Sequence, residues 1–269
     1  MTPEHISSNV ALLGYAFAAL LYLVGVGKTR RTNGTGNVAL AVFTAATLAA
    51  SYTVIAQLQS AQPTMLSGLL LAVAISWLAI LGHIKFKLRL IGAFVAPLAT
   101  LIVLMQFFVT PGHPIATDGT GSSLLLTLHV SMAILGQAFA ILACAVSVFY
   151  LWQQNLLKKK LLSQLPQNLP AIDRIDKLLR LCLWTGYVFI TLGLLSGAIY
   201  TQLYAPPSSW MLSAKVVWAT VVWLWYLATL LAQNIFNRPS KRIAQMCLAG
   251  FLLMALSYFG MGFFLTGGP

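Results

Sequence analysis

The chain has 269 residues, of which 59% are hydrophobic and 7% are charged, and its mean hydropathy is +0.86. A water-soluble domain carries about 25% charged residues. This composition therefore excludes a water-soluble domain and indicates an integral membrane protein. The formal net charge of +12 would suggest nucleic-acid binding in a soluble chain, but the positions of the cations predict membrane topology instead.

Eight apolar segments are long enough to cross a bilayer as helices, which takes about 20 residues. They are too long and continuous for barrel strands, and only helices or closed barrels satisfy the backbone in lipid. The sequence therefore predicts an all-α bundle of eight transmembrane helices, with residues 1–269 forming a single domain. The expected spans are 10–27, 38–57, 65–82, 90–109, 124–152, 179–204, 211–233 and 243–265.

The loops that follow the first, third, fifth and seventh segments, together with Arg180 just inside the sixth segment, hold 15 of the 16 lysines and arginines. The positive-inside rule makes that side cytoplasmic, so both termini are expected outside. The charge then serves topology and contact with anionic lipid headgroups, not nucleic acid. The first segment does not resemble a cleavable signal peptide, because its basic residues follow the apolar run.

All four acidic residues lie outside the apolar segments. A proton-coupled transporter usually carries an acid inside the membrane, so this pattern argues against one. The chain also has no P-loop, metal-spaced Cys/His cluster or nucleophile elbow. We therefore expect no enzyme activity and no catalytic residue. The three cysteines, Cys144, Cys182 and Cys247, are expected to be small packing residues.

His129, in LTLHVSMAILGQAFA, lies six residues past Ser123 and so about 9 Å below the outer helix end. An ionisable group at that depth needs a partner or a function. Its helical face continues with Ala133, Gly136 and Ala140, which let another helix or a flat ligand approach closely. Two hypotheses follow: an imidazole hydrogen-bonded across a helix interface, or an axial ligand to heme iron.

The other histidines carry weaker signals. His113 lies in the external loop PGHPIATDGTGSS and is the only other external candidate for a second iron ligand near this helix. His83 lies at the cytoplasmic mouth of the third segment, where headgroups and lysines surround it. No role is assigned to His5.

The longest extramembrane stretch lies between the fifth and sixth segments. LLKKKLLSQL predicts a helix on the inner leaflet or an extension of the fifth segment. The prolines of LPQNLP interrupt it, and AIDRIDKLL predicts a new helix that leads into the sixth segment.

Lys215 is the one cation expected on the external side, at the start of the seventh segment. It either extends toward the outer headgroups or meets an anion such as a carboxylate or propionate. Trp218, Val222 and Trp225 share its helical face. Trp210 and Trp218 fit an aromatic belt, whereas the deeper Trp223, Trp225 and Tyr226 are expected to pack against neighbouring helices.

Four stretches together resemble the cytochrome c assembly family, closest to the short eight-helix inner-membrane members of its CcsA/HemX-like group. FVAPLATLIVL, which contains Pro97, also resembles the family's fourth helix. The resemblance covers about residues 90–265, and the first three segments agree only in hydropathy and order. The four stretches are LLTLHVSMAILGQAFAILACAVSVFYLWQQNLLKKK, LPQNLPAIDRIDKLLRLCLWTGYVFITLGLLSGAIY, AKVVWATVVWLWYLATLLA and LAGFLLMALSYFGMGFF.

The resemblance implies a bacterial inner-membrane protein that holds or exports heme at the external face and presents it to apocytochrome c or to other maturation factors. It implies that His129 is the first external heme ligand. Trp210, Lys215 and Trp218 would occupy the region of the family's tryptophan-rich heme platform.

The sequence departs from the family pattern at three places. YAPPSSWMLSAK stands where the family clusters tryptophans and an acid. Leu256 stands where a second external histidine is expected, and LLAQN, around Ala232 and Gln233, replaces a histidine of the seventh helix. Three hypotheses follow: a heme-handling cytochrome c maturation component, a membrane scaffold or regulator that has lost the cofactor, and a transporter of another solute.

Overall fold

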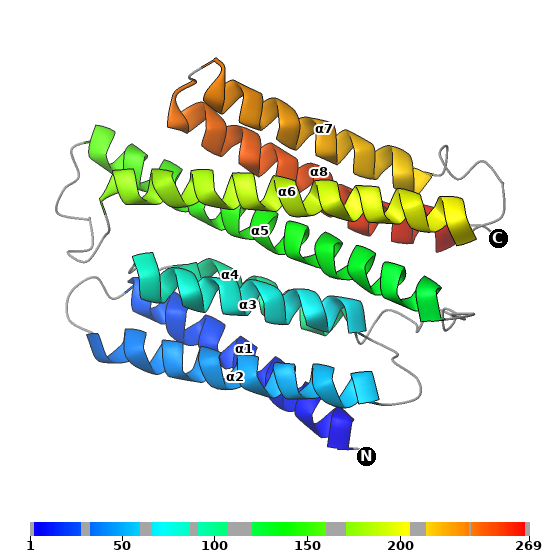
Figure 1. Ribbon diagram of the computed structural model, residues 1–269. Coiled ribbons are helices and arrows are strands. Elements are labelled where there is room, and N and C mark those ends of the chain that lie inside the picture. The colour runs from blue at the N-terminus through cyan, green and yellow to red at the C-terminus, as the bar shows by residue number, and fades with distance from the viewer. Residues whose placement is uncertain are drawn as a thin grey trace. The chain divides into compact units, whose positions relative to one another are not determined.

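The computed structural model describes residues 3–27, 33–59, 66–86, 91–106, 120–159, 171–204, 214–236 and 238–266. Within these ranges the chain is helical, without strands, which confirms the predicted all-α class (Figure 1). The helices are α1 (Pro3–Gly27), α2 (Asn33–Gln59), α3 (Leu66–Phe86), α4 (Ile91–Gln106), α5 (Thr120–Lys158), α6 (Ile172–Tyr204), α7 (Ala214–Asn234) and α8 (Ser240–Thr266).

Each predicted segment corresponds to one of these helices. Six of the helices contain described stretches long and apolar enough to cross a membrane, and a seventh, Ile91–Leu104 in α4, is shorter. These lengths and compositions confirm a polytopic membrane protein. Both termini lie outside the described residues, as does the LPQNLP interruption.

Two helices extend well beyond their apolar runs. α5 continues to Lys158, past the apolar run that ends near residue 152, in agreement with the predicted extension of the fifth segment. α6 begins at Ile172, which confirms the helix that AIDRIDKLL predicts ahead of the sixth segment. Leucine, lysine and glutamine are good helix formers, so a helix need not end where its hydrophobic run ends. Asp173 in the first turn of α6 and Lys158 in the last turn of α5 also suit the helix dipoles.

The contacts divide the chain into two compact units. The first contains residues 1–116 and 153–174, and the second contains residues 117–152 and 175–269. That residues 1–269 form a single domain stays a prediction.

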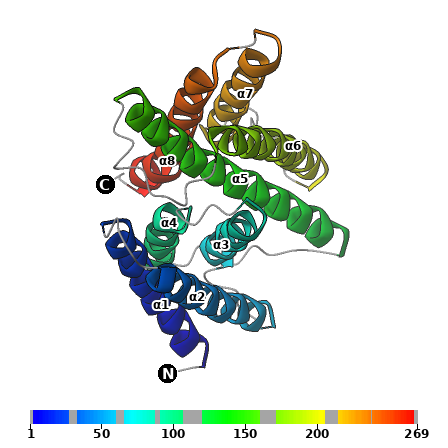
Figure 2. The same ribbon diagram turned by 90° about the vertical axis from the view of Figure 1, so that its left-hand side faces the viewer.

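Small residues bring the helices of the first unit close together. α1 lies alongside α2 and α4, and α3 lies alongside both α2 and α4 (Figures 1 and 2). A Cβ placed on Gly14 of α1 would be 2.8 Å from the Cβ of Ala46 on α2. Close backbone approach of this kind is typical of membrane helices, which gain little from burying apolar side chains that lipid already solvates.

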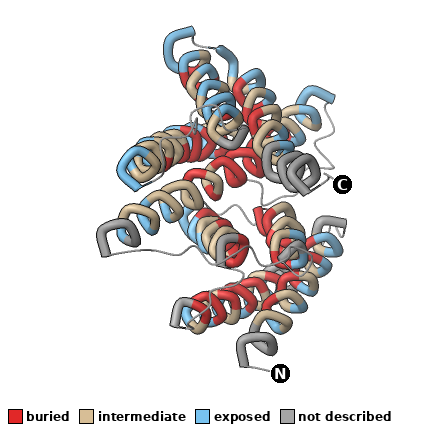
Figure 3. Tube along the Cα trace, turned by 90° about the vertical axis from the view of Figure 1, so that its right-hand side faces the viewer, coloured by how far each residue is buried: buried red, intermediate tan, exposed pale blue. Residues whose placement is uncertain are grey.

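The outward faces of the helices are apolar. Leu13 in α1 is 69% exposed and Leu252 in α8 is 61% exposed, while the buried residues lie along stripes of each helix (Figure 3). Exposed large apolar residues occur on each of the described helices, which suits contact with lipid tails that are themselves apolar.

Candidate functional site

His129 lies in α5, nine residues after Thr120, which places it about 14 Å along the helix at 1.5 Å per residue. The side chain is half-buried, and its Nδ1 lies 2.8 Å from the backbone carbonyl oxygen of Gly193 in α6. The hydrogen bond across a helix interface, one of the two alternatives from the sequence, is therefore confirmed.

This hydrogen bond defines the protonation of the imidazole ring. A carbonyl oxygen can only accept, so Nδ1 must carry the proton that it donates. In the neutral ring the lone pair is then on Nε2. Metal-bound histidines commonly donate their other ring N–H to a backbone carbonyl in this way, so the contact with Gly193 is compatible with the iron-ligand hypothesis as well.

The small residues that follow His129 on α5 pack against α6. A Cβ on Gly136 would be 2.6 Å from Cγ1 of Ile190, and a Cβ on Gly193 would be 3.2 Å from the backbone nitrogen of Ala133. A Cβ on Gly186 would be 3.0 Å from Cβ of Phe139. Of the two occupants expected for this face, another helix is the one observed.

Tryptophans of α7 bind neighbouring helices with their indole N–H groups. Trp218 donates to the carbonyl of Leu253 at 3.0 Å, and Trp225 donates to that of Met246 at 2.9 Å, both in α8. The two donors are seven residues apart, as are the two acceptors, as antiparallel helices require. The predicted packing role of Trp225 is confirmed.

The aromatic residues next to this row also pack between helices. Trp223 donates to Oγ1 of Thr191 in α6 at 2.9 Å and stacks on Tyr187, with ring centroids 5.8 Å apart. Tyr226 is buried to 2% exposure. Their expected packing role is therefore confirmed, and α7 is attached to both α6 and α8.

Three of the other predicted site residues are not described by the structure, wholly or in their side chains, so their place relative to His129 stays a prediction. Trp210 and His113 lie outside the described residues. Lys215 is the second residue of α7, but its side chain is outside the described part, so its two interpretations stay open. In the ranges that the structure describes, no group of three or more His, Cys, Asp or Glu residues is placed to hold a metal ion.

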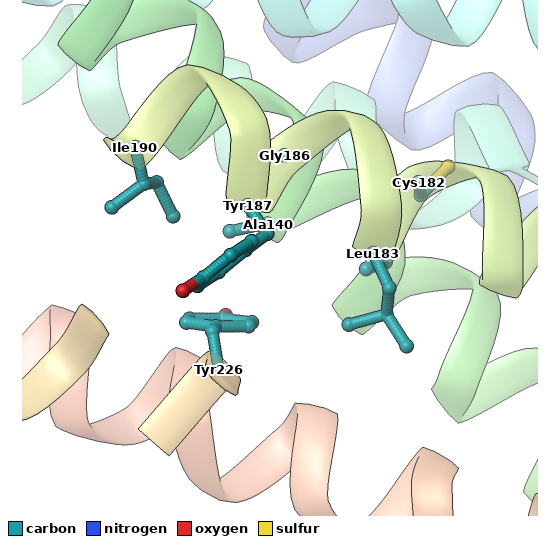
Figure 4. A pocket seen from close by; sticks show the side chains of 8 residues that line it. Ala140, Cys182, Leu183, Gly186, Tyr187, Ile190 and Tyr226 are labelled. Carbon is teal, nitrogen blue, oxygen red and sulfur yellow. The ribbon is translucent and has the colours of Figure 1, made fainter. Parts of the chain in front are cut away.

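A narrow crevice between α5, α6 and α7 holds about 150 Å³ of empty space but no room for a water molecule (Figure 4). Ligand pockets usually measure about 300–1,000 Å³, whereas this crevice does not admit even a water molecule, so it is a packing gap and not a heme pocket. Its lining residues are Ala140, Ala143, Cys182, Leu183, Gly186, Tyr187, Ile190 and Tyr226. The three cysteines are buried and free, as expected of packing residues.

Residues 60–267 match the family model described as cytochrome C assembly protein. The chain belongs to the cytochrome c assembly family. The match begins near the start of α3, about 30 residues before the resemblance recognised in the sequence, so α3 is part of the family region as well.

Named relatives in this cytochrome c assembly family support the same membership. The chain is 30% identical over 216 residues to the "Cytochrome c biogenesis protein CcsA" of Heterosigma akashiwo, covering 66% of each protein. It is 29% identical over 163 residues to "Protein HemX" of Bacillus subtilis, covering 61% of this chain and 59% of that protein. It is 25% identical over 205 residues to CcsA of Prochlorococcus marinus, covering 68% and 65%. The chain thus spans slightly less than two thirds of the length of these relatives.

The positions at which the resemblance predicts further family histidines have different environments. Leu256 in α8 is 61% exposed, and Gln233 in α7 is 4% exposed. The sequence interpretation missed Gly193 and Gly197, which contact His129 directly. The signal was the four-residue spacing of glycines in GLLSG, a pattern typical of close helix packing in membranes.

Proposed function

We propose that this protein handles heme at the external face of a bacterial inner membrane during the assembly of c-type cytochromes. Family membership and the names of the relatives support the pathway. The heme, the face of the membrane and any apocytochrome partner are parts of the proposal. The protein acts as a binding and presenting component, not as an enzyme.

The observation that carries the proposal is the hydrogen bond from Nδ1 of His129 to the carbonyl of Gly193. It leaves the Nε2 lone pair available, and bound heme would supply an iron that accepts this nitrogen as an axial ligand. The bond also restricts rotation of the ring, so the ligand is oriented before heme arrives. Trp210, Lys215 and Trp218 would complete the external site, with Lys215 facing a heme propionate.

The external placement rests on the uneven distribution of cations. Arg238, Lys241 and Arg242 between α7 and α8 belong to the predicted cytoplasmic side. His129 lies near the opposite end of α5 from Lys158. If the cations are cytoplasmic, His129 is in the outer half of the membrane.

A membrane scaffold without heme is the second candidate. Leucine and glutamine occupy two positions at which the resemblance predicts histidine, and the Gly193 carbonyl already satisfies one nitrogen of His129. In this alternative the imidazole only joins two helices.

Heme content separates the two candidates. The protein would be purified in mild detergent from heme-replete cells, and its Soret band compared with that of His129→Asn. The shorter amide retains an N–H near the position of Nδ1, so it preserves the donor but removes the iron ligand. His83→Asn, which alters a histidine in the first unit, is the matched control.

We expect a Soret band in the wild type and in His83→Asn, and its loss in a folded His129→Asn. A colourless, folded wild type would favour the scaffold, whereas a band that survives His129→Asn would refute His129 as the iron ligand. An alkaline phosphatase fusion at the C-terminus tests the topology: enzyme activity supports an external C-terminus, and an inactive but expressed fusion would contradict the external placement of His129.

A further inference from the structure

One turn of α6, Gly193 to Gly197, contacts the imidazole of His129 at two points. Gly193 accepts the Nδ1 hydrogen bond at 2.8 Å. A Cβ on Gly197 would lie 2.6 Å from Cε1, 2.7 Å from Nδ1 and 3.4 Å from Nε2 of the same ring. The Nδ1–Cε1 edge of the imidazole therefore lies directly against Gly197, and Nε2 is the ring nitrogen farther from it.

The two glycines have different neighbours. The atoms nearest a Cβ on Gly193 are the backbone nitrogen and Cα of Ala133, at 3.2 and 3.3 Å, so this glycine permits the close approach of α5. The three atoms nearest a Cβ on Gly197 all belong to the His129 ring. Gly197 therefore provides space for the imidazole and not for the helix backbone.

The Gly193 carbonyl has a lone pair available for His129. A carbonyl oxygen has two lone pairs, and within an α-helix one of them receives the N–H four residues later. The Ser196 hydroxyl lies 2.8 Å from the Leu192 carbonyl and 3.0 Å from that of Gly193. Its single proton has a closer acceptor in Leu192, so it need not displace His129.

We propose that Gly193 and Gly197 are positioning residues that hold His129 in the tautomer protonated on Nδ1, with the Nε2 lone pair directed away from α6. The Gly193 carbonyl retains the proton on Nδ1, and the absent side chain of Gly197 leaves the space that the ring occupies. The importance of this arrangement for heme rests on the proposed function, whereas the tautomer and the ring position can be tested in the heme-free protein.

Gly197→Ala tests the space beside the ring. The three atoms nearest the added methyl all belong to a movable side chain, so we expect the imidazole to be displaced and the separation of α5 and α6 to be retained. Gly25→Ala is the matched control, because a Cβ on Gly25 has nothing within 4 Å. Ser196→Ala removes the neighbouring donor and is expected to leave the ring unchanged.

The tautomer is measured by nitrogen-15 NMR of histidine-labelled, heme-free protein, with the signals of His129 assigned by their loss in His129→Asn. We expect one neutral tautomer, protonated on Nδ1, in the wild type, in Gly25→Ala and in Ser196→Ala. Gly197→Ala is expected to give a mixture of tautomers. A wild-type ring protonated on Nε2, or an unchanged spectrum in Gly197→Ala, would overturn the proposal.

A double-mutant cycle of melting temperatures tests the proposal even if Gly197→Ala folds poorly. The fall in melting temperature caused by Gly197→Ala should be much smaller when His129→Ala is also present, because alanine removes the whole ring, including the Nδ1 and Cε1 atoms nearest the added methyl group. An equal fall in both backgrounds would show that the methyl group clashes with something other than the ring and would refute the proposal.

Heme binding separates this inference from the proposed function. Loss of a hydrogen-bonding partner of a metal ligand typically lowers affinity by about 10–100-fold, and we expect a loss in that range for Gly197→Ala. A wild type that binds no heme but has the predicted tautomer would refute the proposed function and leave the positioning role intact. A wild type that binds heme, together with an unaltered tautomer in Gly197→Ala, would support the proposed function and refute the positioning role.

Discussion

The contact between α5 and α6 supports the candidate site, and Gly136→Ala is the sharpest test of it. A Cβ on Gly136 would be 2.6 Å from Cγ1 of Ile190 and 2.9 Å from the backbone nitrogen of the same residue, whereas ordinary contact begins at 3.4 Å. The side chain of Ile190 can rotate, but its backbone nitrogen can move only with α6. Overpacking of this kind costs about 1–3 kcal/mol, so we expect a loss of stability in that range.

The measurement is unfolding in mixed detergent micelles, followed by far-ultraviolet circular dichroism. Gly25→Ala, in open space on α1, is the control, and the higher helix propensity of alanine should stabilise it by at most about 1 kcal/mol. Ile190→Ala in the Gly136→Ala background should restore part of the stability, because it removes the Cγ1 clash but not the backbone clash.

If Gly136→Ala were as stable as Gly25→Ala, the close approach of α5 and α6 would be wrong. The hydrogen bond between His129 and Gly193 would then have no structural basis, because it requires the same helix separation. If Ile190→Ala restored the full stability of the Gly136→Ala protein, the added methyl group would clash only with the side chain of Ile190 and not with its backbone.

Three further predictions follow from buried and surface contacts. Trp225→Phe removes the N–H that binds the Met246 carbonyl and should cost about 0.6–1.7 kcal/mol in the same unfolding assay; an unchanged midpoint would mean that the indole does not join α7 to α8. Asp176→Asn breaks the exposed i,i+4 pair with Arg180 and should change stability by less than about 0.5 kcal/mol, so a larger loss would contradict a solvent-screened pair. The three cysteines are at most 2% exposed and should resist a maleimide in the folded protein and react after denaturation, whereas fast labelling of the native state would contradict their burial.

Much of the fold follows from the sequence because each membrane helix satisfies its own backbone. A continuous apolar run is sufficient to predict a spanning helix, and all eight were predicted at nearly the observed positions. Hydropathy alone places helix ends less accurately, because charged and polar helix formers extend a helix beyond its hydrophobic run. The start of α6 at Ile172 was predicted from the residues of AIDRIDKLL and not from hydropathy. The family resemblance was also recognisable from the sequence, and the match to residues 60–267 confirmed it.

The sequence by itself determined that the chain is a polytopic membrane protein of apolar helices and that His129 lies inside one of them, because hydropathy and helical rise are local properties. It left two occupants open for the face that carries Ala133 and Gly136. Only the tertiary structure decided that α6 covers this face and that the Gly193 carbonyl binds Nδ1 of His129. The physical reason is that the small residues on α5 permit the close approach of another helix without specifying which one. The partner is selected by the packing of its own glycines and side chains against α5, and these come from a distant segment of the sequence.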